Sequence, residues 1–301
     1  MAGIPFVKDI DFVPGAPDVV LPGVRRVIAN NPGPFTYTGS GTYIIGDGDV
    51  AVIDPGPDRE DHIDALMAAL DGERVSHILI THTHLDHCGG ARAFAERSGA
   101  PILAFGAHPV RERENDAPAL DEGADYAFRP DETIGDGAVI EGPGWRIEAV
   151  HTPGHLSNHL CFALPQEKAL FTGDHIMGWA TTVVAPPDGD MDAYLKSLDA
   201  LLARDDEIYL PTHGAPLKAP QRFVRAVRTH RLMRDAQIVE QVGKGRGRIK
   251  DMVAAMYADV DKRLHGAAAL NVLAHLIRLV RIGTVVCDGE PGLKARYALK
   301  D

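Results

Sequence analysis

The strongest structural signal in this sequence is the segment Thr81-His82-Thr83-His84-Leu85-Asp86-His87. It directly follows Val75–Ile80, an apolar run that predicts a buried strand. His82 and His84 stand two residues apart, so an extended segment directs both imidazoles to the same side. The Asp86-His87 pair follows at once and can turn toward a second position. Imidazole together with carboxylate is typical of Zn²⁺ and other first-row ions, whereas Ca²⁺ requires a shell of oxygen ligands.

Three further predicted strands also end in polar clusters. The strand over 145–150 leads into His151-Thr152-Pro153-Gly154-His155, that over 169–171 into Thr172-Gly173-Asp174-His175, and that over 208–210 into Pro211-Thr212-His213-Gly214. Loops at one edge of a β-sheet would bring such clusters together. The seven candidate ligands are His82, His84, Asp86, His87, His155, Asp174 and His213. This set suits two divalent ions, Zn before Mn or Fe, that share a bridging carboxylate and a bridging water.

Strands and helices are also predicted around these clusters. A hairpin is expected with strands at 42–45 and 50–53 around Gly46-Asp47-Gly48-Asp49. Further strands are predicted over 101–104 and 160–164, and helices over 58–70, 91–98 and 191–202, with Asp58 as the N-cap of the first. Residues 108–137 are rich in Pro, Gly and acidic residues and predict an irregular excursion over the surface.

The sign of the charge changes along the chain. Residues 1–217 contain 14 Lys and Arg against 34 Asp and Glu, a net charge of −20, and residues 218–301 contain 17 against 8, a net charge of +9; together they give −11. Helices over 223–242, 249–257 and 267–282 and a hairpin of 284–287 with 294–299 resemble a winged-helix arrangement. We therefore predict two domains, 1–217 and 218–301. The basic domain either binds a polyanion or docks on the acidic one.

The bulk composition predicts a soluble globular protein. The 301 residues are 45% hydrophobic and 24% charged. The first residues contain no apolar segment typical of a secretion signal, and no apolar run approaches the ~18 residues that span a bilayer. These features predict a cytoplasmic protein without membrane contact. Three cysteines without a C-x-x-C pair do not predict a disulfide framework; Cys88 is either a metal ligand or, more often for such a residue, a small buried filler.

The stretch 81–87 resembles the T-H-x-H-x-D-H signature of the metallo-β-lactamase superfamily, and Asp54, His155, Asp174 and His213 fall where the other motifs of that family would fall. The resemblance covers about residues 20–217. It implies a four-layer αββα sandwich of α/β (α+β) class, followed here by the small winged-helix-like domain. It also implies a hydrolase in which a metal-bridging hydroxide attacks an electrophilic carbonyl or phosphorus.

The resemblance implies a role for each site residue. His82, His84 and His155 would hold one metal ion, Asp86, His87 and His213 the second, and Asp174 would bridge them. Asp86 and Asp174 are therefore also the expected catalytic residues, with Asp86 a candidate for moving a proton. Asp54 would orient ligands through hydrogen bonds, unless it only caps a tight turn.

The substrate prediction depends on the layout of the whole chain. The segments His151–His159, Thr172–Gly178, Thr229–Arg234 and Asn271–Gly283 resemble the β-lactamase-like endoribonucleases, which act on single-stranded RNA and carry a winged-helix-like domain. RNA phosphodiester cleavage is thus the preferred prediction, with Arg246, Arg248 and Lys250 as candidate contacts to the RNA backbone. His159 is a candidate for positioning a scissile phosphate or the metal ligands, and is otherwise a structural residue. Trp179 is expected at the pocket rim or in the core.

Other functions stay open at this point. The main alternative is a thioester hydrolase resembling hydroxyacyl-glutathione hydrolase, acting on a small ester or thioester, although Pro211–Gly214 differs from the Gly-His-Glu-Tyr surroundings of that family. A lactonase or a β-lactamase ranks below both, because an antibiotic β-lactamase is normally exported. A regulator with a degenerate hydrolase domain is opposed by the intact set of seven ligands. The net charge of the first domain argues against the preferred prediction, because it would repel a long nucleic acid.

Overall fold

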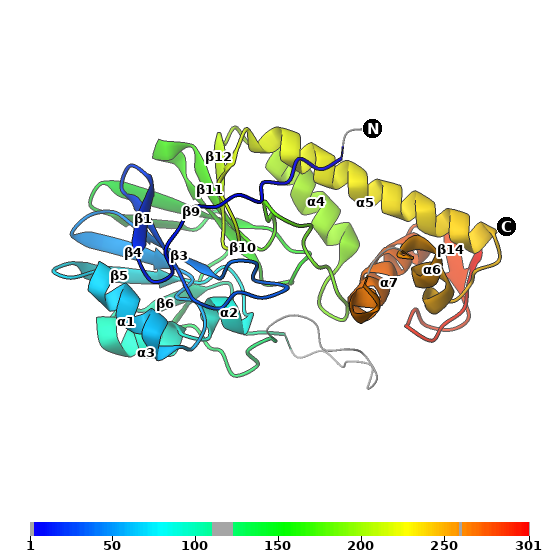
Figure 1. Ribbon diagram of the computed structural model, residues 1–301, viewed down its shortest axis with the longest axis horizontal. Helices are drawn as coiled ribbons and strands as arrows, with labels where there is room; N and C mark the ends of the chain where they lie inside the picture. Colours follow the sequence, from blue (N-terminus) through cyan, green and yellow to red (C-terminus); the bar gives the residue numbers. More distant parts are fainter. Residues whose placement is uncertain (1–2, 110–122, 259–260, 301) are drawn as a thin grey trace.

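The computed structural model describes residues 3–109, 123–258 and 261–300. Two sheets form its centre (Figure 1). The first is seven-stranded, in sequential order from β1 to β7: β1 (Pro17–Leu21), β2 (Val24–Ile28), β3 (Gly41–Ile45), β4 (Asp49–Ile53), β5 (Arg74–Leu79), β6 (Ile102–Ala104) and β7 (Glu132–Thr133). Its first four strands pair antiparallel and its last four pair parallel.

The second sheet has six strands in the reverse order, from β13 to β8. They are β8 (Val139–Gly142), β9 (Trp145–His151), β10 (Leu160–Leu164), β11 (Ala169–Gly173), β12 (Ile208–Pro211) and β13 (Leu217–Lys218). All pair antiparallel except β11 with β12, which are parallel. A parallel pair needs a crossover connection, and the chain between these two strands contains the helix α4 (Met191–Leu202).

Three apolar cores hold four layers together. The middle core lies between the sheets, where the rings of Tyr43 and Phe171 meet at 4.9 Å between centroids. On the outer face of the first sheet pack α1 (Glu60–Ala69) and α3 (Ala91–Ser98). On the outer face of the second pack α4 and the start of α5 (Pro220–Gly243). The predicted αββα sandwich is therefore confirmed.

A fourth core belongs to the C-terminal part of the chain. It is built from the end of α5, α6 (Ile249–Met256), α7 (His265–Arg281) and the antiparallel pair β14 (Val285–Cys287) and β15 (Tyr297–Leu299). Figure 1 shows α5 running from the sheets to this module. The start of α5 contributes Phe223 and Val224 to the core of the second sheet, and its end contributes Ile238 and Val242 to the C-terminal core. The division at 217/218 falls inside β13 and stays a prediction.

Part of the basic charge of residues 218–301 pairs with the acidic first domain. Arg228 lies 2.5 Å from the carboxylate of Asp199, and Arg281 lies 2.8 Å from that of Asp190. Both carboxylates belong to α4 or its N-cap, so these pairs fasten the C-terminal helices to the hydrolase domain. This geometry favours the docking interpretation of the charge asymmetry for these two arginines.

None of the helices in the described part of the chain combines the length and the apolar composition needed to span a bilayer.

Two local predictions need correction. Asp58 is not the cap of α1: the cap is Arg59, whose carbonyl accepts the first helical hydrogen bonds, and the acidic Glu60 and Asp61 stabilise the first turn instead. The chain after His84 turns into the short helix α2 (Leu85–Cys88), which carries Asp86 and His87. Strands β1, β2, β7, β8 and β13 were not predicted, and β7 lies in the segment 108–137 that was expected to be irregular. In β2, the two charged residues Arg25 and Arg26 interrupt the apolar pattern from which a buried strand is predicted. Arg26 is nevertheless buried, because Asp18 neutralises it at 2.8 Å across the β1–β2 pair. The excursion predicted over 108–137 lies partly outside the described residues.

The buried side chain of His62 on α1 is expected to make the folded state less stable in acid. Its side chain is 2% exposed, its Nε2 lies 2.9 Å from the Thr42 hydroxyl, and its Nδ1 has no hydrogen-bond partner among the described residues. Burial lowers the pKa of His62 from 6.5 to about 4. The folded state therefore binds this proton less readily than the unfolded state, so stability falls as the pH drops from 6.5 toward 4, by about 3 kcal/mol in all.

His62→Gln, which keeps a donor for Thr42, is expected to remove this contribution. The measurement is the free energy of unfolding in urea at several pH values between 4 and 7, for wild type and variant. Subtracting the two curves cancels every other titrating group. A difference that does not change with pH would contradict the burial argument.

Candidate metal centre

The first cluster of ligand atoms is formed by three histidines that follow β5 and β9. His84 Nδ1 lies 3.0 Å from His82 Nε2 and 3.0 Å from His155 Nε2. All three side chains are buried. Ring nitrogens that converge in this way can all direct lone pairs at one cation, and Asp174 completes a group whose ligand atoms lie within 4.8 Å of one another.

The second cluster comes from α2 and the end of β12. His213 Nε2 lies 3.1 Å from Asp86 Oδ2, and His87 Nε2 lies 3.4 Å from the same oxygen. The helical turn at α2 explains the split between the clusters, because it carries Asp86 and His87 away from the side to which His82 and His84 point.

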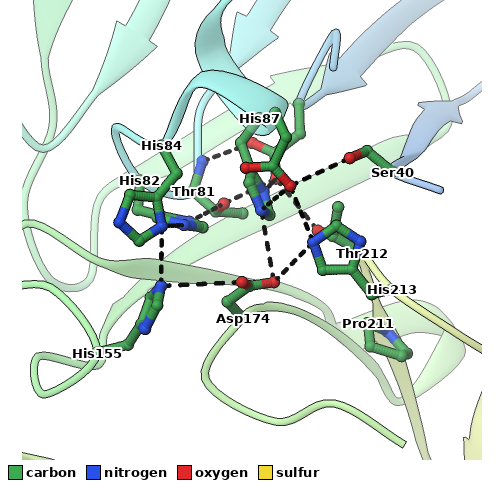
Figure 2. Close-up of polar contacts among 12 residues, drawn as sticks. Ser40, Thr81, His82, His84, His87, His155, Asp174, Pro211, Thr212 and His213 are labelled. Atoms are coloured by element: carbon green, nitrogen blue, oxygen red, sulfur yellow. Dashed lines mark hydrogen bonds and ion pairs between the residues drawn. The ribbon is translucent and has the colours of Figure 1, made fainter. Parts of the chain in front are cut away.

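Asp174 lies between the two clusters (Figure 2). Its Oδ2 is 3.8 Å from His155 Nε2, while its Oδ1 is 3.4 Å from His87 Nε2 and 3.3 Å from His213 Nε2. One carboxylate oxygen thus faces each cluster. A ligand that bridges two cations needs such an arrangement, and the bridging role of Asp174 stays a prediction.

The outer nitrogens of the histidines are held by oxygen acceptors. His155 Nδ1 lies 2.7 Å from the Val183 carbonyl oxygen, His87 Nδ1 lies 2.8 Å from Asp54 Oδ2, and His213 Nδ1 lies 3.1 Å from the Gly39 carbonyl oxygen. Each contact holds a proton on the outer nitrogen. Burial lowers the pKa of His87 and of His213, but the carboxylates of Asp86 and Asp174 outweigh it and raise both, so a bound cation would replace a proton on each of these two inner nitrogens. Among the described residues, His87 Nε2 and Asp174 Oδ1 are buried atoms without a hydrogen-bond partner. The donor set therefore fits two divalent cations.

The electrostatics of the clusters keep the carboxylates ionised. Burial raises the pKa of Asp86, but the imidazoles of His87 and His213 outweigh it and bring the pKa down to about 2. Burial lowers the pKa of His82 well below its ordinary value, and the neighbouring imidazoles act in the same direction. Asp86 is consequently an anion and His82 a neutral imidazole at neutral pH, which are the forms that bind metal.

Asp54 lies behind the second cluster with a fully buried carboxylate. It accepts hydrogen bonds from the Thr81 backbone N–H at 2.8 Å, the Thr81 hydroxyl at 2.7 Å and His87 Nδ1 at 2.8 Å. Its φ of 49° is left-handed, a conformation that is strained for a residue with a side chain. The carboxylate thereby ties the motif Thr81–His87 to the end of β4 and fixes the ring of His87.

His159 is wholly buried and lies behind Asp174 rather than beside an open site. Its Nε2 accepts from the Asp174 backbone N–H at 3.2 Å, and its Nδ1 lies 2.9 Å from the Thr152 hydroxyl. Both ring nitrogens are therefore engaged, so of the two predicted roles the geometry favours positioning of a metal ligand over contact with a phosphate.

Cys88 takes the less specific of its predicted roles, whereas Trp179 belongs to none of the described apolar cores. Cys88 is 2% exposed in the core beneath α1 and α3 and belongs to neither ligand cluster. Trp179 is half-buried and stacks on Tyr37, with 4.7 Å between ring centroids and 10° between the planes.

Sequence reasoning did not identify three supporting residues. Ser40 donates to Asp86 Oδ2 at 3.2 Å, the Gly39 carbonyl oxygen holds His213, and the Thr182 hydroxyl donates to the Asp174 carbonyl oxygen at 2.7 Å. The run of small residues Gly39-Ser40-Gly41 before β3 is the signal that could have pointed to the first two.

Comparison with known families gives the class of the protein. The chain belongs to the metallo-beta-lactamase superfamily, whose family model matches residues 37–213. A model of the beta-lactamase associated winged helix domain matches residues 249–293. The resemblance stated from the sequence is thus confirmed, together with the C-terminal winged helix, and the chain is a metal-dependent hydrolase.

Individual relatives narrow the comparison. An atrochrysone carboxyl ACP thioesterase of Aspergillus chevalieri is 33% identical over 269 residues, which cover 86% of this chain and 79% of that protein. A protein of the same name from Aspergillus fumigatus is 35% identical over 233 residues. These residues cover 74% of this chain and 65% of that protein, just under two thirds of its length.

Solved structures agree in fold. A metallo-beta-lactamase family protein of Thermus thermophilus is similar with a TM-score of 0.75 and 22% identity, covering 94% of this chain and 100% of that one. A beta-lactamase domain protein of Burkholderia ambifaria is similar with a TM-score of 0.76 and 21% identity, covering 96% of this chain and 95% of that one.

Proposed function

We propose that this protein is a binuclear metal-dependent thioesterase that hydrolyses an acyl thioester. The observation that carries the proposal is that relatives named thioesterases match most of the chain at more than 30% identity. The two ions, with Zn preferred over Mn or Fe, would be held by His82, His84 and His155 on one side and by Asp86, His87 and His213 on the other, with Asp174 between them. When bound, two such cations acidify a water molecule and stabilise negative charge on a carbonyl oxygen.

Other residues of the chain orient the proposed metal ligands and place negative charge around them. Ser40 and Asp54 hold Asp86 and His87, and His159 holds the backbone of Asp174. A thiolate is a stable leaving group, since a free thiol has a pKa of about 8.5. Thioester hydrolysis therefore makes little demand on a general acid, which agrees with a His159 whose two nitrogens are both engaged.

Charge also favours a thioester over RNA. The residues that surround the metal ligands belong to the segment 1–217 with its net charge of −20. The candidate RNA contacts Arg246, Arg248 and Lys250 are exposed, but they lie beyond the C-terminal end of α5, in the C-terminal module (Figure 1). Cleavage of single-stranded RNA, preferred from the sequence, stays a prediction that the named relatives do not support.

The test is a comparison of substrates with purified protein of known metal content. The substrates are an acyl N-acetylcysteamine thioester, S-lactoylglutathione and single-stranded RNA, each at several salt concentrations, with Asp174→Asn as the inactive control. We expect thiol release from at least one thioester, lost in the variant, and no RNA cleavage. RNA cleavage that needs Asp174 and weakens with salt, without thioester turnover, would overturn the proposal.

A further inference from the structure

The loop that follows β11 supports two of the proposed metal ligands from outside the cluster. The Thr182 hydroxyl donates to the Asp174 carbonyl oxygen at 2.7 Å. The next residue, Val183, accepts from His155 Nδ1 at 2.7 Å through its carbonyl oxygen. Two adjacent residues of the loop thus hold one ligand of the first cluster and the ligand between the clusters.

This loop is in turn held by the C-terminal part of the chain. Arg231, in the middle of α5, donates from Nη2 to the Thr182 carbonyl oxygen. Its guanidinium also lies 5.3 Å from the centroid of the Tyr194 ring. Ala185 of the same loop packs against the core formed by α5, α6 and α7. The metal centre is therefore connected to α5 through three residues, Asp174, Thr182 and Arg231.

Arg231 is an unusual side chain for such a place. It is 1% exposed, and its Nε has no hydrogen-bond partner among the described residues. Asp235, one turn along α5, pairs with Arg278 at 2.6 Å and with His275 at 2.7 Å instead. Burying a charge that lacks a carboxylate partner is costly, and an apolar side chain of similar volume would fill the same space without that cost. The directed hydrogen bond to Thr182 is what an apolar side chain could not supply.

We infer that Arg231 is a positioning residue for the metal centre, acting through Thr182 and Val183 on Asp174 and His155. The inference rests on the assignment of those two residues as ligands under the proposed function. It makes the C-terminal module part of the support of the catalytic site. Outer hydrogen-bond partners of metal ligands typically change metal affinity by about 10- to 100-fold.

The test measures metal affinity rather than activity alone. Metal-free wild type, Arg231→Met and Arg231→Lys are titrated with Zn²⁺ in competition with a chromophoric chelator. We expect Arg231→Met to bind Zn²⁺ about 10- to 100-fold more weakly. Arg231→Lys retains a cationic donor toward the Thr182 carbonyl and is expected to recover part of the loss. Arg225→Met, an exposed arginine on the same helix, serves as the control that leaves the affinity unchanged.

A fourth variant separates positioning from general destabilisation. Val253→Ala removes apolar volume from the same C-terminal core, and Val253 has no polar group to offer the loop. Thermal unfolding ranks the variants by stability. Equal affinity losses in Arg231→Met and Val253→Ala, or wild-type affinity in Arg231→Met, would overturn the inference. Asp174→Asn is titrated alongside: wild-type affinity there would show that the ligand assignment itself fails.

Discussion

Asp174→Asn is expected to lower the bound metal from two ions toward one or none, and to reduce hydrolysis by more than about 100-fold, beyond the range seen for outer partners of metal ligands. Oδ1 of Asp174 faces His87 and His213, and Oδ2 faces His155. An amide replaces one of these oxygens by an N–H group, which cannot bind a cation, so one of the two clusters loses its shared ligand. Metal content is measured by elemental analysis after dialysis, and activity by thiol release.

Asp199→Asn is the matched control for this experiment. It makes the same chemical change on α4, where the carboxylate is exposed and pairs only with Arg228 in the described structure. It is expected to retain both metal content and activity. A metal-replete and fully active Asp174→Asn variant would contradict the bridging role.

Asp54→Asn is expected to lower the metal affinity by about 10- to 100-fold and to reduce the stability of the folded chain. The buried carboxylate accepts four hydrogen bonds, from the Thr81 backbone, the Thr81 hydroxyl, His87 Nδ1 and the Thr212 hydroxyl. An amide turns one acceptor into a donor, so either His87 or Thr81 meets an N–H group. The buried mismatch costs about 1–3 kcal/mol.

The measurement is a chelator competition titration together with urea unfolding. Asp58→Asn, an exposed carboxylate four residues along the chain, is the control and is expected to leave both quantities unchanged. If Asp54→Asn lost stability but kept its metal affinity, Asp54 would act only as a cap of the turn after β4.

The metal centre was predictable because its ligands follow a local rule. The spacing of His82 and His84 and the placement of His155, Asp174 and His213 after strands are properties of short segments. Asp54, which holds His87, was expected from its motif, but other residues that hold these ligands were not predictable in the same way. Gly39 and His213 are 174 positions apart, and Arg26, whose guanidinium donates to the Gly214 carbonyl at 3.0 Å, is 188 positions from its partner. Such contacts exist only once the two sheets have closed on each other.

The prediction of an RNA substrate shows that the net charge of a segment does not identify its ligand. The positive net charge of residues 218–301 predicted either a polyanion ligand or docking on the acidic domain, and a sum over a segment cannot distinguish the two. In the structure, Arg228 and Arg281 pair with the first domain, and Arg231 is buried beneath it. Arginine in this segment therefore serves assembly in part, and only the arrangement of individual side chains reveals that.

Because both modules share helix α5, neither module can be exchanged for another without changing this helix. Because it contributes Phe223 and Val224 to one core and Ile238 and Val242 to another, neither module closes its interior without it. A recombination event that brought a different C-terminal module would have to preserve both halves of α5, and Arg231 with them, to leave the hydrolase domain intact. The two modules are consequently expected to be inherited together, unlike two domains joined by a flexible linker.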